Sequence, residues 1–173
     1  EKLPTRIKDT VCILTRAQDS WAAAFGAFML SKQAGLDIDF AWCLDEVPES
    51  DVYMLPSVSG GASLPKHFTD VLYERVKNGA TLYISIDDAL ISEFERLFGL
   101  KVITRSRACT DTKFMLDGEK FSVQKPYTTV YENAGATVLL SDERGMPVVA
   151  EKGYGKGRLV FVSFPIEHIA ATH

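Results

Sequence analysis

The sequence predicts an α/β fold with a mostly parallel sheet flanked by helices and a second half rich in β-hairpins. Before Lys101, short apolar runs typical of buried strands alternate with segments of helical periodicity. This order implies right-handed crossovers and therefore parallel strands. From Lys101 onward, strand-like runs follow one another and are separated by turn residues. We expect residues 1–173 to form a single domain, because a chain of this length can build one sizeable core.

The first half contains four predicted strands and three predicted helices. The strands are the apolar or alternating runs at residues 10–15, 36–44, 52–57 and 80–86. The helices follow capping residues or a proline and end at glycines, over residues 21–35, 65–79 and 87–99. In the second helix, the spacing of the apolar residues predicts that its buried face carries Phe68, Leu72 and Val76.

The second half is predicted to be mainly β. Its strand-like runs cover residues 101–108, 113–123, 128–134, 137–152 and 157–164. Asp117-Gly118 and Arg144-Gly145 are hairpin turn signals. The glycine-rich segment from Gly153 to Arg158 lies between strands, so it indicates another hairpin rather than a nucleotide site. The last run is apolar on both faces, and we expect it to return to the main sheet.

Charge and composition exclude several classes of partner. The formal charge is −4 and the 19 Lys and Arg residues are scattered, so we expect no nucleic-acid partner. The apolar runs are too short to span a bilayer, which predicts a soluble chain without a membrane partner. The three cysteines form no CxxC pair and Cys12 lies in a predicted strand, which favours a reducing compartment such as the cytoplasm. The histidine spacing supports no zinc site, and we expect neither a metal nor a cofactor.

Candidate ligand-binding residues lie where parallel strands end, because ligands of such sheets gather at the carboxyl ends of the strands. They are Ser57, Ser59, Asp87, Asp88 and the nearby Trp21. Each also has a purely structural interpretation. The loop of the two serines lacks a phosphate-loop lysine and could be a plain connection, and one aspartate could cap the following helix. The tryptophan could stack on a sugar or belong to the core.

Three segments together resemble a known fold family. They are DVYMLPSVSGG, NGATLYISIDDALISEFERLFG and GYGKGRLVFVSFPIEH. The pattern resembles the class I glutamine amidotransferase-like fold, which has a flavodoxin-like arrangement. More narrowly, it is similar to the accessory domain, sometimes called a trimerisation domain, of bacterial β-galactosidases and related glycoside hydrolases. The resemblance implies that the chain was excised from a longer multidomain enzyme of carbohydrate metabolism.

The resemblance also implies that the family's chemistry is lost. Active amidotransferases have a cysteine nucleophile where this chain has Ile86, Asp87 and Asp88. Their His-Pro-Glu-like element corresponds here to a vestigial region with Pro165 and Glu167, where no histidine precedes the proline. Without a thiolate and a placed base, acyl transfer from glutamine has no mechanism.

Three functions are therefore open. The first is a non-catalytic accessory module that serves packing, oligomer contacts or shaping of the active site of a parent glycoside hydrolase. Its partners would be the other domains of that enzyme or further copies of the chain. The second is a small-molecule or sugar-binding module that uses the strand-end residues. The third is an independent hydrolase with Ser57 or Asp87 as nucleophile and His168 as base, although the chain has no GxSxG elbow.

Overall fold

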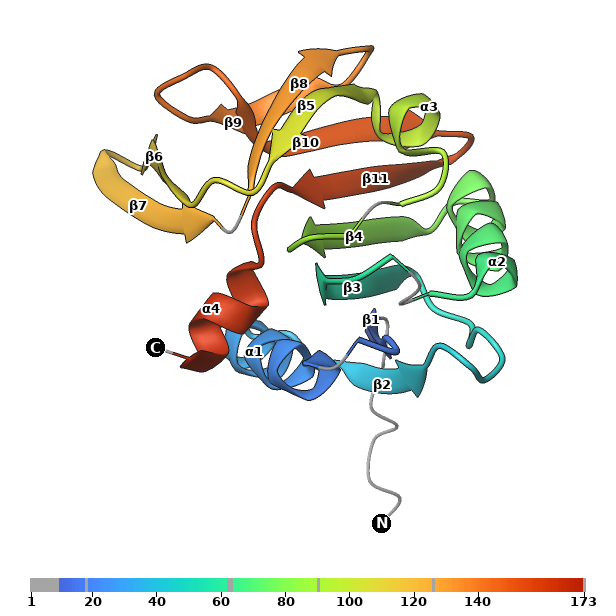
Figure 1. The fold of residues 1–173 in the computed structure, drawn as a ribbon. Helices are drawn as coiled ribbons and strands as arrows, with labels where there is room; N and C mark the ends of the chain where they lie inside the picture. The colour runs from blue at the N-terminus through green and yellow to red at the C-terminus, as the bar shows by residue number, and fades with distance from the viewer. Residues whose placement is uncertain (1–9, 18, 62–63, 90, 126, 173) are drawn as a thin grey trace.

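The fold is organised around a seven-stranded mixed sheet with the strand order β2-β1-β3-β4-β11-β10-β9 (Figure 1). A computed structural model describes residues 10–17, 19–61, 64–89, 91–125 and 127–172. The strands of this sheet are β1 (Thr10–Leu14), β2 (Asp39–Trp42), β3 (Val52–Val58), β4 (Thr81–Ile86), β9 (Thr137–Ser141), β10 (Pro147–Tyr154) and β11 (Gly157–Val162). Neighbours from β2 to β11 are parallel, whereas β10 is antiparallel to both β11 and β9. The α/β class and the return of the last strand are thereby confirmed.

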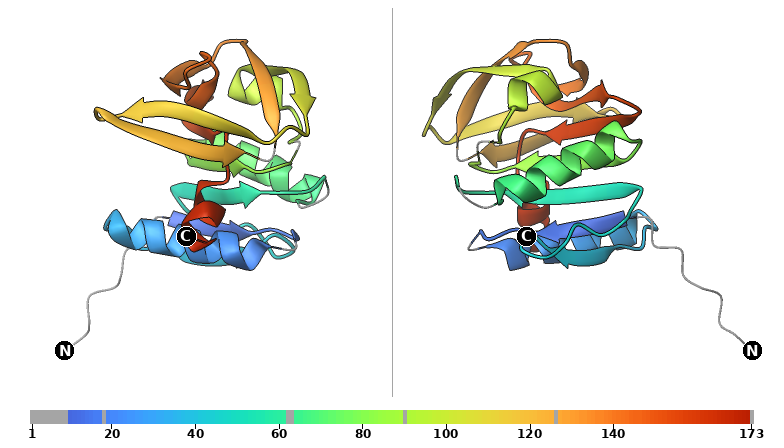
Figure 2. Two further views of the ribbon diagram at one scale, coloured as in Figure 1. Left: turned by 60° about the vertical axis from the view of Figure 1, so that its left-hand side comes forward. Right: turned by 90° about the vertical axis from the view of Figure 1, so that its right-hand side faces the viewer.

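Helices cover both faces of the sheet (Figure 2). They are α1 (Ser20–Gln33), α2 (Lys66–Lys77), α3 (Phe94–Phe98) and α4 (Ile166–Thr172). One face carries α1 and α4, and the opposite face carries α2 and α3. None of the helices in these ranges is long and apolar enough to cross a lipid bilayer.

The main hydrophobic core lies between the sheet and α2 with α3. The predicted buried face of α2 is confirmed, since Phe68, Leu72 and Val76 are all buried there. A smaller cluster lies on the other face and consists of Phe114, Val148, Val162 and Phe164. Cys12 is also fully buried, as its place in an apolar strand predicted.

Two strand pairs in the second half lie outside the main sheet. β5 (Leu100–Ser106) pairs with β8 (Thr128–Asn133), and β6 (Thr110–Leu116) pairs with β7 (Glu119–Lys125). The predicted hairpin turns are confirmed, because Asp117-Gly118 joins β6 to β7 and the Gly153–Arg158 segment joins β10 to β11. The β5–β8 pair packs on the sheet through Tyr131, whose ring centroid lies 5.9 Å from that of Phe161.

The predicted helix over residues 87–99 is wrong for most of its length. The structure contains only the five-residue α3 at its end. The amides of Asp87 and Ala89 donate to the carbonyl oxygen of Val58, so this segment bonds to the end of β3 instead of turning into a helix. The side chain of Asp88 bonds to the loop after β3 rather than capping a helix, since its Oδ1 accepts from the amide of Gly60 at 2.6 Å.

Helix α1 buries its small residues and exposes its aromatic ones. Its buried positions are Ala23, Ala24, Gly26, Ala27 and Ser31. Trp21, by contrast, is 78% exposed, so its interpretation as a core residue is wrong. The small face allows α1 to approach α4 closely. A β-carbon at Gly26 would lie 1.8 Å from the carbonyl oxygen of Glu167.

We expect Gly26→Ala to destabilise the protein by about 1–3 kcal/mol, because the methyl group would push α1 away from α4. Helix propensity alone would act in the opposite direction by about 1 kcal/mol. Urea unfolding measures the difference. Gly153→Ala is the matched control, because a β-carbon there meets nothing within 4 Å. A loss at Gly26 no larger than that of the control would contradict the close helix contact.

Candidate functional site

A cavity of about 80 Å³ lies at the carboxyl ends of β4 and β11. The sheet contributes residues just after these two strands, and the opposite wall comes from α3, β5, β7 and β8. Its polar lining consists of Asp87, Arg105, Lys125, Tyr127, Thr129 and Ser163. Its apolar lining consists of Ile86, Ala89, Ile91, Phe94, Val102, Tyr131 and Pro165. This placement agrees with the rule that parallel sheets form sites at their carboxyl edge.

Lys125, at the end of β7, places an amino group in this cavity. Its Nζ donates to Oγ of Ser163 at 2.7 Å, which among the described residues is the one hydrogen bond of its three N–H donors. Burial lowers the pKa of Lys125 to about 8, against the attraction of Asp142 and together with the repulsion of Arg144. The amine is therefore held in a position where its charge is poorly solvated.

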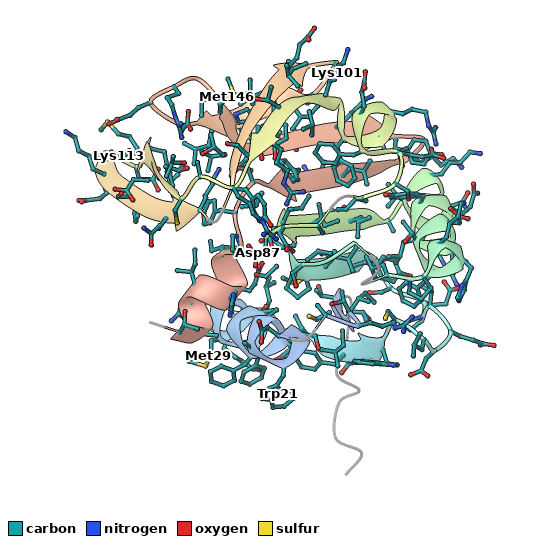
Figure 3. The ribbon with its side chains drawn as sticks, in the orientation of Figure 1. Trp21, Met29, Asp87, Lys101, Lys113 and Met146 are labelled. Atoms are coloured by element: carbon teal, nitrogen blue, oxygen red, sulfur yellow. The ribbon has the colours of Figure 1, made fainter. Side chains whose placement is uncertain are left out.

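Asp87, directly after β4, is the acidic residue of the cavity lining. Its Oδ1 is buried and has no hydrogen-bond partner among the described residues. Burial raises the pKa of this carboxyl, the neighbouring Asp88 raises it further, and His168 and Arg105 act in the opposite direction. Figure 3 shows Asp87 at the carboxyl edge of the sheet, near the middle of the molecule. A buried acceptor without a donor is costly, which makes this oxygen the least satisfied group of the site.

Arg105 and Tyr127 form the outer part of the wall. The guanidinium of Arg105 lies 4.2 Å from the centroid of the Tyr127 ring, a cation–π contact. One of its nitrogens donates to the carbonyl oxygen of Asp88. The β5–β8 pair therefore supplies an oriented cation, and among the described residues the other guanidinium N–H groups have no side-chain carboxylate partner.

Lys125 should make stability depend on pH. Because its pKa is lower in the folded chain than the ordinary 10.5, the unfolded chain binds more protons between about pH 8 and 10.5. The contribution of this residue to the free energy of unfolding therefore rises with pH across that window, by about 2–3 kcal/mol. We expect Lys125→Met to remove this rise in urea unfolding measured from pH 7 to 10.5. Lys120→Met, on an exposed position of the same strand, should retain it. Parallel pH profiles for Lys125→Met and the wild type would contradict this account.

A second polar cluster lies inside the molecule, around the carboxylate of Glu167 in α4. This side chain is only 1% exposed. Its oxygens accept hydrogen bonds from the hydroxyls of Ser57, Ser85 and Tyr83. Burial and the adjacent carboxylate raise the pKa of Tyr83, so the phenol stays protonated and remains a donor. No lysine or arginine bonds to Glu167 among the described residues, and hydroxyl groups alone satisfy it.

Ser57 is the strained member of this cluster. Its φ is 47°, a left-handed backbone conformation that non-glycine residues rarely adopt. Its Oγ donates to Glu167 at 2.9 Å and accepts from the backbone amide of His168 at 3.1 Å. Within the described chain, the imidazole of His168 makes no hydrogen bond to Ser57 or Asp87. These two bonds hold the Ser57 hydroxyl in place. Among the described residues, no imidazole is positioned to take its proton.

We expect Glu167→Ala to lower the free energy of unfolding by about 3–5 kcal/mol, because it leaves three buried hydroxyls without an acceptor. Tyr83→Phe should cost about 1 kcal/mol, because it removes a single bond. Glu95→Ala, at an exposed glutamate in α3, serves as the control and should change stability by less than about 0.5 kcal/mol. Equal losses for Glu167→Ala and Glu95→Ala would show that the buried cluster is not a major stabilising contact.

The structure separates the residues that the sequence grouped together. Asp87 lines the cavity, whereas Ser57 belongs to the Glu167 cluster. Asp88 ties the two strand-end loops together, and Ser59 is half-buried in the loop after β3. Trp21 lies on the outer side of α1, pointing away from the sheet and from Asp87 (Figure 3). The five candidates therefore do not form one pocket.

The two residues of the vestigial region, Pro165 and Glu167, also lie in different places. The proline lines the cavity, and the glutamate lies in the buried cluster. Sequence reasoning missed Arg105, Lys125, Tyr127 and Ser163 as site residues. The basic and aromatic residues of the segments TRSR and QKPY could have indicated a binding site. Their spacing, however, does not show that the strands that carry them cover the edge of the main sheet.

Among the residues with described positions, no group of three or more His, Cys, Asp and Glu side chains is arranged to hold a metal ion. Burial and the nearby Glu167 raise the pKa of the Cys12 thiol, which keeps it in its neutral form within the core.

Comparisons with known proteins show similarity at the level of the fold. Neither a protein-family description nor a curated protein matches the sequence. The exo-β-1,4-mannosidase Op5Man5 from Opitutaceae bacterium strain TAV5 gives a TM-score of 0.79 at 15% identity, over 95% of this chain and 32% of that one. For the GH42 β-galactosidase Gan42B from G. stearothermophilus, the TM-score is 0.68 at 18% identity, over 91% and 27%.

A third similar structure is a cytoplasmic protein, STM1381, from Salmonella typhimurium LT2. It gives a TM-score of 0.59 at 12% identity, over 90% of this chain and 87% of that one. The chain thus spans about a third of the two glycoside hydrolases, which is compatible with an accessory domain, and most of the shorter protein. At these identities the likeness shows the fold alone.

Proposed function

We propose that this chain is a non-catalytic, amidotransferase-like accessory module of a glycoside hydrolase, with a flavodoxin-like arrangement and one domain over residues 1–173. The observation that carries the proposal is the partial match to larger enzymes. The fold covers nearly all of this chain but only 27–32% of two glycoside hydrolase chains. In such an enzyme the module would contact other domains and help to shape the assembly.

An exposed apolar surface supports a packing role. Trp21, Phe25 and Met29 project from α1 and are 78%, 49% and 41% exposed. On the neighbouring β2, Phe40 and Trp42 are 45% and 38% exposed. We call these five residues the α1–β2 surface, and its two elements lie side by side in Figures 1 and 2. Soluble chains rarely leave several large apolar side chains together in water, so such a surface indicates a contact site. We assign it to another domain of the parent enzyme.

The polar geometry supports a module without chemistry of its own. No cysteine follows β4, where the resemblance places a nucleophile, and the segment there is Ile86, Asp87 and Asp88. The independent hydrolase is disfavoured, because the Ser57 hydroxyl donates to a buried carboxylate instead of to an imidazole. The alternative of a small-molecule-binding module is favoured by one observation, the cavity at the strand ends.

The first experiment is to read the coding sequence that flanks these 173 codons. We expect it to encode a glycoside hydrolase barrel. The full-length enzyme would then carry the double substitution Trp21→Ser and Phe25→Ser. We expect the substitutions to weaken the domain contact by about 2–4 kcal/mol, since buried aromatic anchors dominate such contacts. A lower melting temperature and a lower kcat/KM would report this.

The matched control is the double substitution Met115→Ser and Leu139→Ser, at positions 55% and 56% exposed outside the α1–β2 surface. It should leave melting temperature and kinetics unchanged. A change in subunit number with intact kinetics would instead identify a second copy of the chain as the occupant of the surface. If the flanking sequence encodes no hydrolase, or if deletion of residues 10–172 leaves assembly and kinetics unchanged, the accessory role is refuted.

A further inference from the structure

The cavity at the carboxyl ends of β4 and β11 is lined by an amine that has no acidic partner. Lys125 is part of the lining, and its Nζ donates to Oγ of Ser163 at 2.7 Å. Among the residues with described positions, no carboxylate forms an ion pair with this amine, and the serine is its one hydrogen-bond partner. Lysines are seldom taken out of water without an acidic group to pair with, so this amine needs an explanation.

Burial makes the amine less basic than that of an ordinary lysine. It lowers the pKa of Lys125 to about 8, against the attraction of Asp142 and together with the repulsion of Arg144. At pH 7 about a tenth of amines with that pKa are neutral, compared with fewer than about one in a thousand at the ordinary 10.5. The neutral form has the lone pair that attacks a carbonyl carbon.

The size and the walls of the cavity restrict which carbonyl compound fits. The volume is about 80 Å³. A single water needs about 10–15 Å³, so the space suits a molecule of about two or three carbons. Apolar side chains form much of the lining, among them Ile86, Phe94 and Val102. Such walls bind little water, and the exclusion of water protects an imine from hydrolysis.

Ser163 is positioned to assist the proton transfer that imine formation requires. Its amide donates to the carbonyl oxygen of Val148 at 3.0 Å, which fixes the residue directly after β11. Its hydroxyl accepts from Nζ of Lys125, and a hydroxyl can donate as well as accept. It can therefore relay a proton between the nitrogen and the oxygen of a bound carbonyl group.

We propose that Lys125 binds a small aldehyde of about two or three carbons as a reversible imine. The lone pair of Nζ forms a bond to the carbonyl carbon, and the π electrons of the C=O bond move to its oxygen. A proton passes from the nitrogen to that oxygen through Ser163, which gives a carbinolamine. The hydroxyl group then leaves as water with the remaining proton of the nitrogen, and a C=N bond forms. Amine and aldehyde thus give imine and water, without an oxidant or a reductant.

This inference rests on the cavity and not on the accessory role, because every residue that it uses belongs to this chain. Imine formation is binding rather than turnover, so it requires neither a cysteine nucleophile nor a catalytic triad. It deepens the alternative of a small-molecule-binding module, since it names the group that the ligand must carry.

The test is reductive trapping of the chain with glycolaldehyde, a two-carbon aldehyde, and sodium cyanoborohydride at neutral pH. The reductant converts an imine into a stable secondary amine, and peptide mass spectrometry measures the labelling rate of each lysine. We expect Lys125 to be labelled at least about tenfold faster than Lys120, an exposed lysine on the same strand. In concentrated urea, which removes the cavity, the two rates should become equal.

Two further measurements on the wild type connect the labelling to the cavity. The labelling rate of Lys125 should level off above about pH 8, because most of the amine is then already neutral. Pyridoxal, whose substituted ring is too large for a cavity of about 80 Å³, should show no preference for Lys125 over Lys120.

Ser163→Ala should lower the labelling rate of Lys125 by about tenfold, because the amine loses its hydrogen-bond partner and its proton relay. The rates of the exposed lysines should stay the same, which reports that the fold is intact. Ser122→Ala, at an exposed serine of β7, is the matched control and should leave the rate of Lys125 unchanged.

Equal labelling of Lys125 and Lys120 in the native chain would overturn the proposal. A preference that persists in urea would also overturn it, because the reactivity would then not depend on the fold. An equal preference with pyridoxal would overturn the assignment to small aldehydes, and an unchanged rate in Ser163→Ala would overturn the role of the hydroxyl. None of these outcomes bears on whether the chain belongs to a larger hydrolase.

Discussion

The rest of the structure depends on one buried carboxylate, that of Glu167. It lies in the last helix and accepts hydrogen bonds from residues of β3 and β4, so it fastens the end of the chain to the middle of the sheet. Among the described residues only hydroxyls bond to this buried group, so it tolerates little displacement, because any lost donor leaves one of its oxygens without a partner. This demand explains why α1 has a glycine at Gly26, where the backbone of α4 passes. It also explains why Ser57 keeps a strained backbone.

The sequence was sufficient for the parallel half of the sheet and for the turns. The buried runs of β1, β3 and β4 and the apolar face of α2 have local patterns that the tertiary structure preserves. The local sequence pattern gave a wrong prediction where contacts with residues distant in the sequence determine the backbone conformation. Residues 87–89 look like a helix start but bond to Val58 and Gly60 instead. In α1, small and aromatic residues recur with the same periodicity, and the close contact with α4 selects the small ones for burial.

The candidate site was predictable only on its sheet side. The rule that ligands gather at the carboxyl ends of parallel strands found Asp87, and it also favoured Ser57, which packing then draws into the interior. Arg105 and Lys125 come from strands outside the main sheet. Their position over the strand ends depends on how the β5–β8 and β6–β7 pairs pack against the main sheet. The spacing of residues in the sequence does not predict that packing.

The strand order also constrains the sequence of events during synthesis. β11 is synthesised after the other strands of this sheet, yet it lies in the interior of the sheet, between β4 and β10. Until Val162 has been made, one edge of β4 is unpaired, and β10 has no strand that joins it to β4. The pairing of β11 with β4 joins residues that are far apart in the sequence, and such contacts form slowly. Until they form, the unpaired edge of β4 can pair with other chains and aggregate. We therefore expect the yield of native chain to depend on chaperones that shield β4 during translation.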